Sequence, residues 1–242
     1  MQKDYKMRNE KNKKFDLKEK LPSFKINMFK AFVRNNYKEI CTRKNFLEIR
    51  SDLKRFNFED FEQELALLKK RNNPLIKIVQ GKSTERYVDF GNLILTVDKF
   101  DKNHFLLIPK DLSYFNVLNM TAADIPLLQE MKNIVSKHVE NDGQNCVQFF
   151  HCYPFNSIHT LHLHIISSEN YVPKNNNLRI DDVIFVLKNE QILDTFFSTN
   201  AISSFTLKQA ASLIDDETFV MDYMFAKHKL NKNELLFLKN EL

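Results

Sequence analysis

The fold is predicted from one stretch, residues 157–167, which reads Ser-Ile-His-Thr-Leu-His-Leu-His-Ile-Ile-Ser. A β-strand points alternate side chains to opposite faces. One face of this strand is apolar and can meet a core, and it carries Leu161, Leu163 and Ile165. The other face carries Thr160, His162 and His164. The alternation therefore predicts a strand over Leu161–Ser167 with two imidazoles side by side on the face opposite the core.

Two neighbouring histidines on one strand have three interpretations. They can be incidental surface residues. They can be two ligands of a zinc ion, although a third ligand would have to come from elsewhere in the chain. They can also be a catalytic pair, in which one neutral imidazole attacks phosphorus and forms a covalent phosphohistidine while the other binds the phosphoryl oxygens. We favour the catalytic pair, because both histidines stand on the polar face of a cleanly alternating strand.

The composition limits how the chain can bind phosphate and where it works. Its 242 residues are 43% hydrophobic and 28% charged, but only 3 are glycine. A glycine-rich phosphate loop is therefore excluded, and side chains must bind any phosphate. The three cysteines, at positions 41, 146 and 152, show no C-x-x-C spacing. This favours a reducing compartment, so we expect a cytoplasmic or nuclear protein.

The positive charge is concentrated at the N-terminus. The formal net charge is +5, and residues 1–20 hold eight Lys or Arg against four Asp or Glu, so residues 21–242 carry only +1. We interpret residues 1–20 as a basic flexible tail. Nucleic acid stays open as a partner, but no basic face indicates it. No apolar run approaches the roughly 20 residues that span a bilayer, so we expect no membrane partner.

Around the histidine strand, the sequence predicts an antiparallel sheet, one long helix and helical extensions. Further strands are expected at 75–79, 86–88, 93–97, 104–108 and 146–150. Apolar residues from Leu127 to Val139 recur every three or four positions, which predicts a helix with Pro126 in its first turn. Other helices are expected at 58–71, 219–230 and 232–242, and a loop at 173–177. The expected organisation is a tail (1–20), a helical N-terminal extension (21–73), a core (74–172) and a mainly helical C-terminal extension (173–242).

Residues 160–166, Thr-Leu-His-Leu-His-Ile-Ile, resemble the histidine triad motif. Residues 74–81, Pro-Leu-Ile-Lys-Ile-Val-Gln-Gly, are similar to the opening strand of Hint-type proteins. Residues 104–110, His-Phe-Leu-Leu-Ile-Pro-Lys, resemble the family's H-x-L-V-I-P-K strand. The resemblance covers about residues 74–169. It implies an α+β fold with an antiparallel sheet and a long helix, extended here by helices at both ends.

The resemblance also implies a role for each matching residue. His162 matches the catalytic nucleophile that takes up a nucleotidyl group. The other matches assign phosphate binding to His164, Ser157 and Asn156, support of the triad to Thr160 and His104, and ribose binding to Asp98. The transferase branch of the superfamily has glutamine at position 164, so histidine there favours the hydrolase branches. No cofactor and no metal are expected.

The chain departs from the family pattern at three places. Thr160 replaces the first triad histidine, so we expect Thr160→His to speed formation of the nucleotidyl intermediate; the adjacent His159 should point to the opposite face. Asn73 and Ile76 stand where zinc-binding relatives have C-x-x-C. Residues 151–154, His-Cys-Tyr-Pro, resemble the H-x-x-P segment of aprataxin and scavenger decapping enzymes, but stand about two residues further upstream.

The resemblance predicts a nucleotide hydrolase that acts at an α-phosphate through a nucleotidyl-histidine intermediate. Its substrate would be a nucleoside phosphoramidate, a dinucleoside polyphosphate, a cap remnant or an adenylated nucleic-acid end. The alternative is a weakly active or inactive protein of this fold that binds nucleotides or protein partners, as Thr160 and the two extensions suggest. Hint-type relatives dimerise through the core, so a homodimer is compatible with the resemblance.

Overall fold

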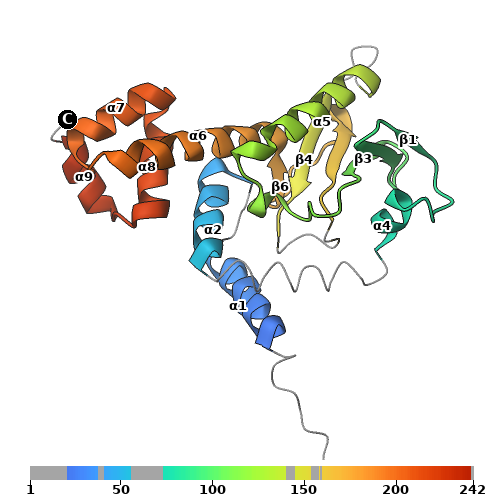
Figure 1. The fold of residues 1–242 in the computed structure, drawn as a ribbon, viewed down its shortest axis with the longest axis horizontal. Helices are drawn as coiled ribbons and strands as arrows, with labels where there is room; N and C mark the ends of the chain where they lie inside the picture. The colour runs from blue at the N-terminus through green and yellow to red at the C-terminus, as the bar shows by residue number, and fades with distance from the viewer. Residues whose placement is uncertain are drawn as a thin grey trace, which may run out of the picture.

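The centre of the computed structural model, which describes residues 21–37, 41–55, 73–139, 145–153, 158 and 160–240, is one antiparallel sheet (Figure 1). Its six strands are β1 (Tyr87–Asp89), β2 (Leu93–Val97), β3 (His104–Pro109), β4 (Cys146–His151), β5 (Leu163–Ser167) and β6 (Asn177–Arg179). They lie in the order β1-β2-β3-β5-β4-β6, and every pair is antiparallel. The expected α+β fold is confirmed.

Helices precede, interrupt and follow the sheet. They are α1 (Leu21–Asn36), α2 (Arg43–Arg55), α4 (Pro74–Val79), α5 (Ile125–His138), α6 (Ile180–Thr199), α7 (Ser204–Ile214), α8 (Glu217–Tyr223) and α9 (Lys232–Asn240), with a π-helical turn over Met224–His228. Short 3-10 turns are η2 (Val117–Asn119), η3 (Ala122–Asp124) and η4 (Ser168–Asn170). In Figure 1, α6 runs from the sheet to a group formed by α7, α8 and α9. Within the described ranges, no helix has the length and apolar character needed to cross a membrane.

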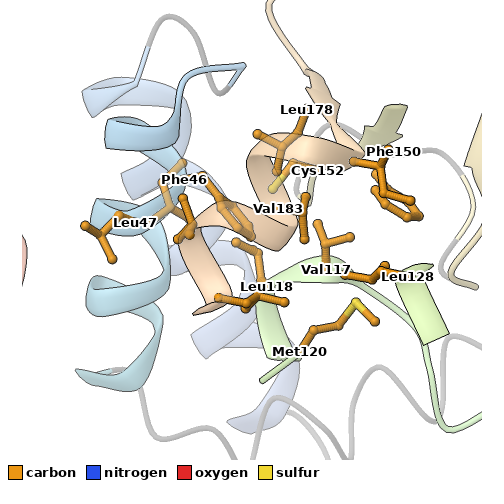
Figure 2. Close-up of a cluster of buried hydrophobic side chains, with 14 of the residues drawn as sticks. Phe46, Leu47, Val117, Leu118, Met120, Leu128, Phe150, Cys152, Leu178 and Val183 are labelled. Atoms are coloured by element: carbon orange, nitrogen blue, oxygen red, sulfur yellow. The ribbon is translucent and has the colours of Figure 1, made fainter. Parts of the chain in front are cut away.

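The main core lies between the sheet and α5 and continues into both extensions. Apolar residues of β5 and β2 pack with residues of α5, among them Leu163, Leu93 and Met131. Figure 2 shows how the core extends further, through side chains of α2, the 117–120 segment, α5, β4 and the residue that follows it, β6 and α6. They are Phe46, Leu47, Val117, Leu118, Met120, Leu128, Phe150, Cys152, Leu178 and Val183. The two extensions and the sheet therefore share one hydrophobic core.

A buried arginine of α2 strengthens this connection. Arg50, 5% exposed, donates from Nε to Glu190 Oε2 of α6 over 3.0 Å. Its Nη1 donates to the carbonyl oxygens of Leu118 and Met120, each at 2.7 Å. Lys227 of the π-helical turn lies beside the other oxygen of Glu190. One ion network thus joins α2, the loop before α5, α6 and the C-terminal helices.

The opposite face of the sheet is covered in part by α4. Leu75 and Ile78, three residues apart on this helix, pack on β2 and β3 residues, which are Ile94, Leu106 and Ile108. The prediction of a strand over Leu75–Val79 is therefore wrong. Asn73 caps the segment by accepting from Leu75 N at 3.0 Å, and Pro74 stands at the first helical position, which together favour a helix.

The other elements predicted from the sequence can be compared with the structure one by one. The strand at 93–97 and the long helix with Pro126 in its first turn are confirmed. The histidine strand begins at Leu163, two residues later than predicted. The expected loop at 173–177 leads into β6, which pairs with the outer edge of β4. The predicted helix at 58–71 and the basic tail at 1–20 lie outside the described residues.

Candidate functional site

Four histidines gather on the sheet face opposite α5. His104 begins β3, His151 ends β4, His164 lies in β5, and His162 immediately precedes β5. His164 is central: its ring centroid lies 4.1 Å from that of His151, 4.6 Å from that of His162 and 5.0 Å from that of His104. The antiparallel pairing produces this cluster, because it places matching faces of β3, β5 and β4 side by side.

His162 is held in one tautomer. Its Nδ1 lies 2.6 Å from the carbonyl oxygen of Thr160, and a carbonyl can only accept a hydrogen bond. The side chain is 8% exposed, and burial lowers its pKa below the usual value for histidine, although the Thr160 bond opposes this shift. The ring is therefore neutral at pH 7, with the proton on Nδ1 and the lone pair on Nε2.

His164 is oriented by neighbours on both adjacent strands. Its Nδ1 lies 2.8 Å from Nε2 of His104, and its ring stacks on Phe149 at a centroid distance of 5.1 Å. The other nitrogen, Nε2, is buried and has no hydrogen-bond partner among the described residues. Burial lowers the pKa of His164, and the other histidines and a nearby lysine add to the shift. His164 therefore presents a neutral ring with one nitrogen still available.

Asp98 lies behind His104. Its Oδ2 is 3.6 Å from His104 Nδ1, and its backbone N–H donates to the carbonyl of His104 at 2.7 Å. Burial lowers the pKa of His104, while Asp98 opposes the shift. The structure thus brings Asp98 to the edge of the cluster, and the expected ribose-binding role stays a prediction.

Three further residues of the site have a weak or no signal in the sequence. His151 is noticeable in the sequence only as part of the H-x-x-P resemblance. Asn177 is its pairing partner on β6, and burial lowers the pKa of His151 to about 4. Lys174, an exposed residue, lies close enough for its charge to lower the pKa of three of the histidines. Lys174 and Asn177 belong to an Asn-rich segment without periodicity, so only the tertiary structure places them here.

Thr160 is 2% exposed and is contacted from α4. Its hydroxyl accepts a hydrogen bond of 2.7 Å from Nδ2 of Asn73, the capping residue of that helix. Thr160 thus binds Asn73 through its side chain and His162 through its backbone. The sequence indicates Asn73 only as a departure from the zinc-type pattern.

Some predicted site residues lie outside the described part of the chain. These are Ser157 and Asn156, proposed for phosphate binding, together with His159. Within the described part, no group of three or more His, Cys, Asp or Glu side chains is arranged to hold a metal ion.

Comparison with known proteins gives one family match. Residues 71–179 match the family described as scavenger mRNA decapping enzyme, C-terminal binding. None of the curated proteins matches the chain significantly.

Similar solved structures include three histidine triad proteins. A histidine triad protein from Clostridium difficile is 16% identical, with a TM-score of 0.38, over 43% of this chain and 96% of its own. A HIT family hydrolase from Legionella pneumophila Philadelphia 1 is 21% identical, with a TM-score of 0.33, over 40% and 93%. A zinc-bound histidine triad family protein from Mycobacterium smegmatis is 16% identical, with a TM-score of 0.34, over 51% and 96%.

Proposed function

Because residues 71–179 belong to the histidine triad superfamily, we propose that this protein hydrolyses a nucleotide linkage at its α-phosphate through a nucleotidyl intermediate on His162. The observation that carries the proposal is the 2.6 Å contact between His162 Nδ1 and the Thr160 carbonyl. It holds the proton on Nδ1, so the lone pair of Nε2 is free to attack. Burial keeps the ring neutral, as a nucleophilic imidazole must be.

The same contact assists the chemical step. Nε2 of His162 attacks the α-phosphorus, a P–N bond forms, and the bond from phosphorus to the leaving group breaks with its electron pair going to that group. The imidazole gains positive charge in this step. A carbonyl oxygen 2.6 Å from Nδ1–H therefore stabilises the transition state more than the ground state. Water then attacks the phosphorus, the P–N bond breaks with its electron pair returning to Nε2, a proton of the water passes to solvent, and neutral His162 is regenerated.

The neighbouring groups suit the phosphoryl oxygens. We propose that His104 donates from Nε2 to Nδ1 of His164, so that the proton of His164 stands on its buried Nε2, which has no partner among the described residues. That N–H can donate to a phosphoryl oxygen at little cost, because it is already desolvated. Lys174 adds positive charge at the same site.

Among the expected substrates, we propose a cap remnant as the first to test. The matching family is described by scavenger mRNA decapping, and a cap remnant contains a phosphate anhydride that a nucleotidyl transfer can split. A nucleoside phosphoramidate, a dinucleoside polyphosphate and an adenylated oligonucleotide complete the panel. The substrate with the highest kcat/KM identifies which hydrolase branch of the superfamily the protein resembles in activity.

The test traps the intermediate on the intact protein. After brief incubation with each substrate, mass spectrometry under mild, non-acidic conditions should detect one phosphoramidate-linked nucleotide per chain. His162→Ala should abolish both the adduct and turnover, because removing a nucleophile costs several orders of magnitude in rate.

His138→Ala is the matched control, since His138 is an exposed histidine at the end of α5 that packs on Phe90. It should retain the adduct. If wild-type protein binds nucleotide but forms no adduct and shows no turnover, the inactive nucleotide-binding alternative replaces this proposal. A His162→Ala variant with more than about a tenth of wild-type turnover would exclude the covalent mechanism.

A further inference from the structure

We infer that Asn73 is a positioning residue for the nucleophile, acting on His162 through Thr160. The inference rests on the proposed function for its catalytic consequence, but the geometry on which it stands is independent of the substrate. Two short hydrogen bonds in series carry it: Asn73 Nδ2 to Thr160 Oγ1 at 2.7 Å, and His162 Nδ1 to Thr160 O at 2.6 Å.

The segment that orients His162 is not part of the sheet. β5 begins at Leu163, and its pairing with β3 also begins there. The carbonyl of Thr160 therefore has no place in a strand ladder that would fix its direction. The backbone N–H of Leu161 donates to the Tyr114 carbonyl at 3.2 Å, which holds the next residue rather than the Thr160 carbonyl. The orientation of that carbonyl needs another support.

Asn73 can provide the support that orients the Thr160 carbonyl. Its Oδ1 accepts from Leu75 N at 3.0 Å, so the amide is fixed in orientation by the first turn of α4. Pro74 restricts the backbone on its C-terminal side. The Nδ2 group of the same amide donates to the Thr160 hydroxyl. Both residues are buried, with Asn73 9% exposed and Thr160 2% exposed.

Fixing the hydroxyl of Thr160 also fixes its backbone. Threonine is β-branched and stiff at χ1, so a clamped Oγ1 restricts the main chain to which it is attached. The Thr160 carbonyl is then held toward Nδ1 of His162. If the carbonyl could turn away, His162 would also populate the tautomer with its proton on Nε2, and the lone pair would be on the wrong nitrogen. Asn73 and Thr160 are also both positions at which the sequence departs from the family pattern.

The direct measurement is the tautomer of His162, read from the ¹⁵N chemical shifts of its ring by NMR. Wild-type protein should show the Nδ1–H tautomer. Asn73→Ala removes the donor, and Thr160→Val removes the acceptor with little change of shape. Each should produce a mixture of tautomers, whereas Thr160→Ser, which keeps the hydroxyl, should retain most of the wild-type signal.

Asn116→Ala is the matched control. Asn116 is also buried, at 4% exposed, and it also caps a helical turn by accepting from the N–H two residues on, Leu118, at 3.0 Å. The hydrogen bond that Asn116 accepts comes from Leu118 of η2, which lies outside the histidine cluster. Asn116→Ala should therefore lower stability by a similar amount and leave the tautomer of His162 unchanged.

The catalytic readout is single-turnover formation of the nucleotidyl adduct. Asn73→Ala and Thr160→Val should each slow it about tenfold, with KM little changed, since poor positioning affects the reacting group rather than binding. The double variant should be no slower than either single variant, because both act through one hydrogen bond.

Three outcomes would overturn the inference: an unchanged tautomer in both single variants, an equal change in Asn116→Ala, or additive losses in the double variant. If Asn73→Ala fails to fold, Thr160→Val decides the question. A wild-type protein that forms no adduct removes the proposed function, while the NMR comparison still decides whether Asn73 positions His162.

Discussion

The Nε2 atom of His104 lies 2.8 Å from Nδ1 of His164, so β3 orients a histidine that β5 carries. His104 pairs in the ladder with Ile166, two residues beyond His164, and the contact therefore crosses the strands diagonally. Such diagonal neighbours lie within reach of aromatic side chains. On the other side of the His104 ring, Nδ1 lies 3.6 Å from Oδ2 of Asp98. Asp98, His104 and His164 are therefore successive neighbours, and the last of them carries the buried Nε2.

His104→Ala should reduce kcat of nucleotide hydrolysis by about tenfold or more. It leaves Nδ1 of His164 without its partner in a buried site, and an unsatisfied buried group costs about 1–3 kcal/mol. His104→Gln can still hydrogen-bond and should recover part of the loss. Steady-state kinetics with the best substrate of the panel provides the measurement. Equal activity of wild type and His104→Ala would contradict the proposed support of His164.

Thr160→His should slow formation of the nucleotidyl adduct, the reverse of the expectation from the sequence alone. Thr160 is 2% exposed and its hydroxyl is bound by Asn73, so an imidazole has no free space and Asn73 loses its acceptor. Overpacking of this kind costs about 1–3 kcal/mol. Urea unfolding together with single-turnover kinetics tests this. A faster and equally stable Thr160→His variant would show that the site can accept a third imidazole.

Stability should decrease as the pH falls from about 6.5 toward about 4. Burial lowers the pKa of His151 from its ordinary 6.5 to about 4, and lowers the pKa values of His104, His162 and His164 as well. In this range the unfolded chain binds more protons than the folded chain, so protonation favours unfolding. Urea unfolding at several pH values measures the slope.

The variant that checks the assignment is His151→Gln. It removes one group that titrates differently in the two states, so its free energy of unfolding should depend less steeply on pH than that of wild type. An identical slope in the two proteins would show that His151 does not contribute.

Arg50→Ala should lower the free energy of unfolding by about 3–5 kcal/mol, because it leaves Glu190 buried with part of its charge compensation removed. It also leaves the carbonyls of Leu118 and Met120 without a donor. Lys132→Ala is the comparison, since Lys132 and Asp181 form an ion pair whose side chains are 35% and 59% exposed. That pair should contribute about 1 kcal/mol or less. Similar losses in the two variants would contradict the structural importance of the Arg50 network.

The fold class and the central pair of histidines can be predicted from the sequence. Both depend on short-range periodicity: alternation over residues 161–167 separates His162 and His164 from the core, and helical spacing over 127–139 defines α5. Such patterns are visible because each residue's environment is set by its own element. The 93–97 strand was predictable for the same reason.

The other contacts of the site depend on tertiary packing and cannot be predicted from local patterns. His151 approaches His164 because β4 pairs with β5, and Lys174 and Asn177 lie near His151 because β6 adds to the outer edge of β4. Arg50 meets Glu190 across 140 residues of chain. Asn73 reaches Thr160 over 87 residues, and only because residues 74–79 form a helix where an apolar run suggested a strand. These contacts depend on which elements pack together, and short apolar segments do not encode that choice locally, since a strand and a buried helical turn have the same composition.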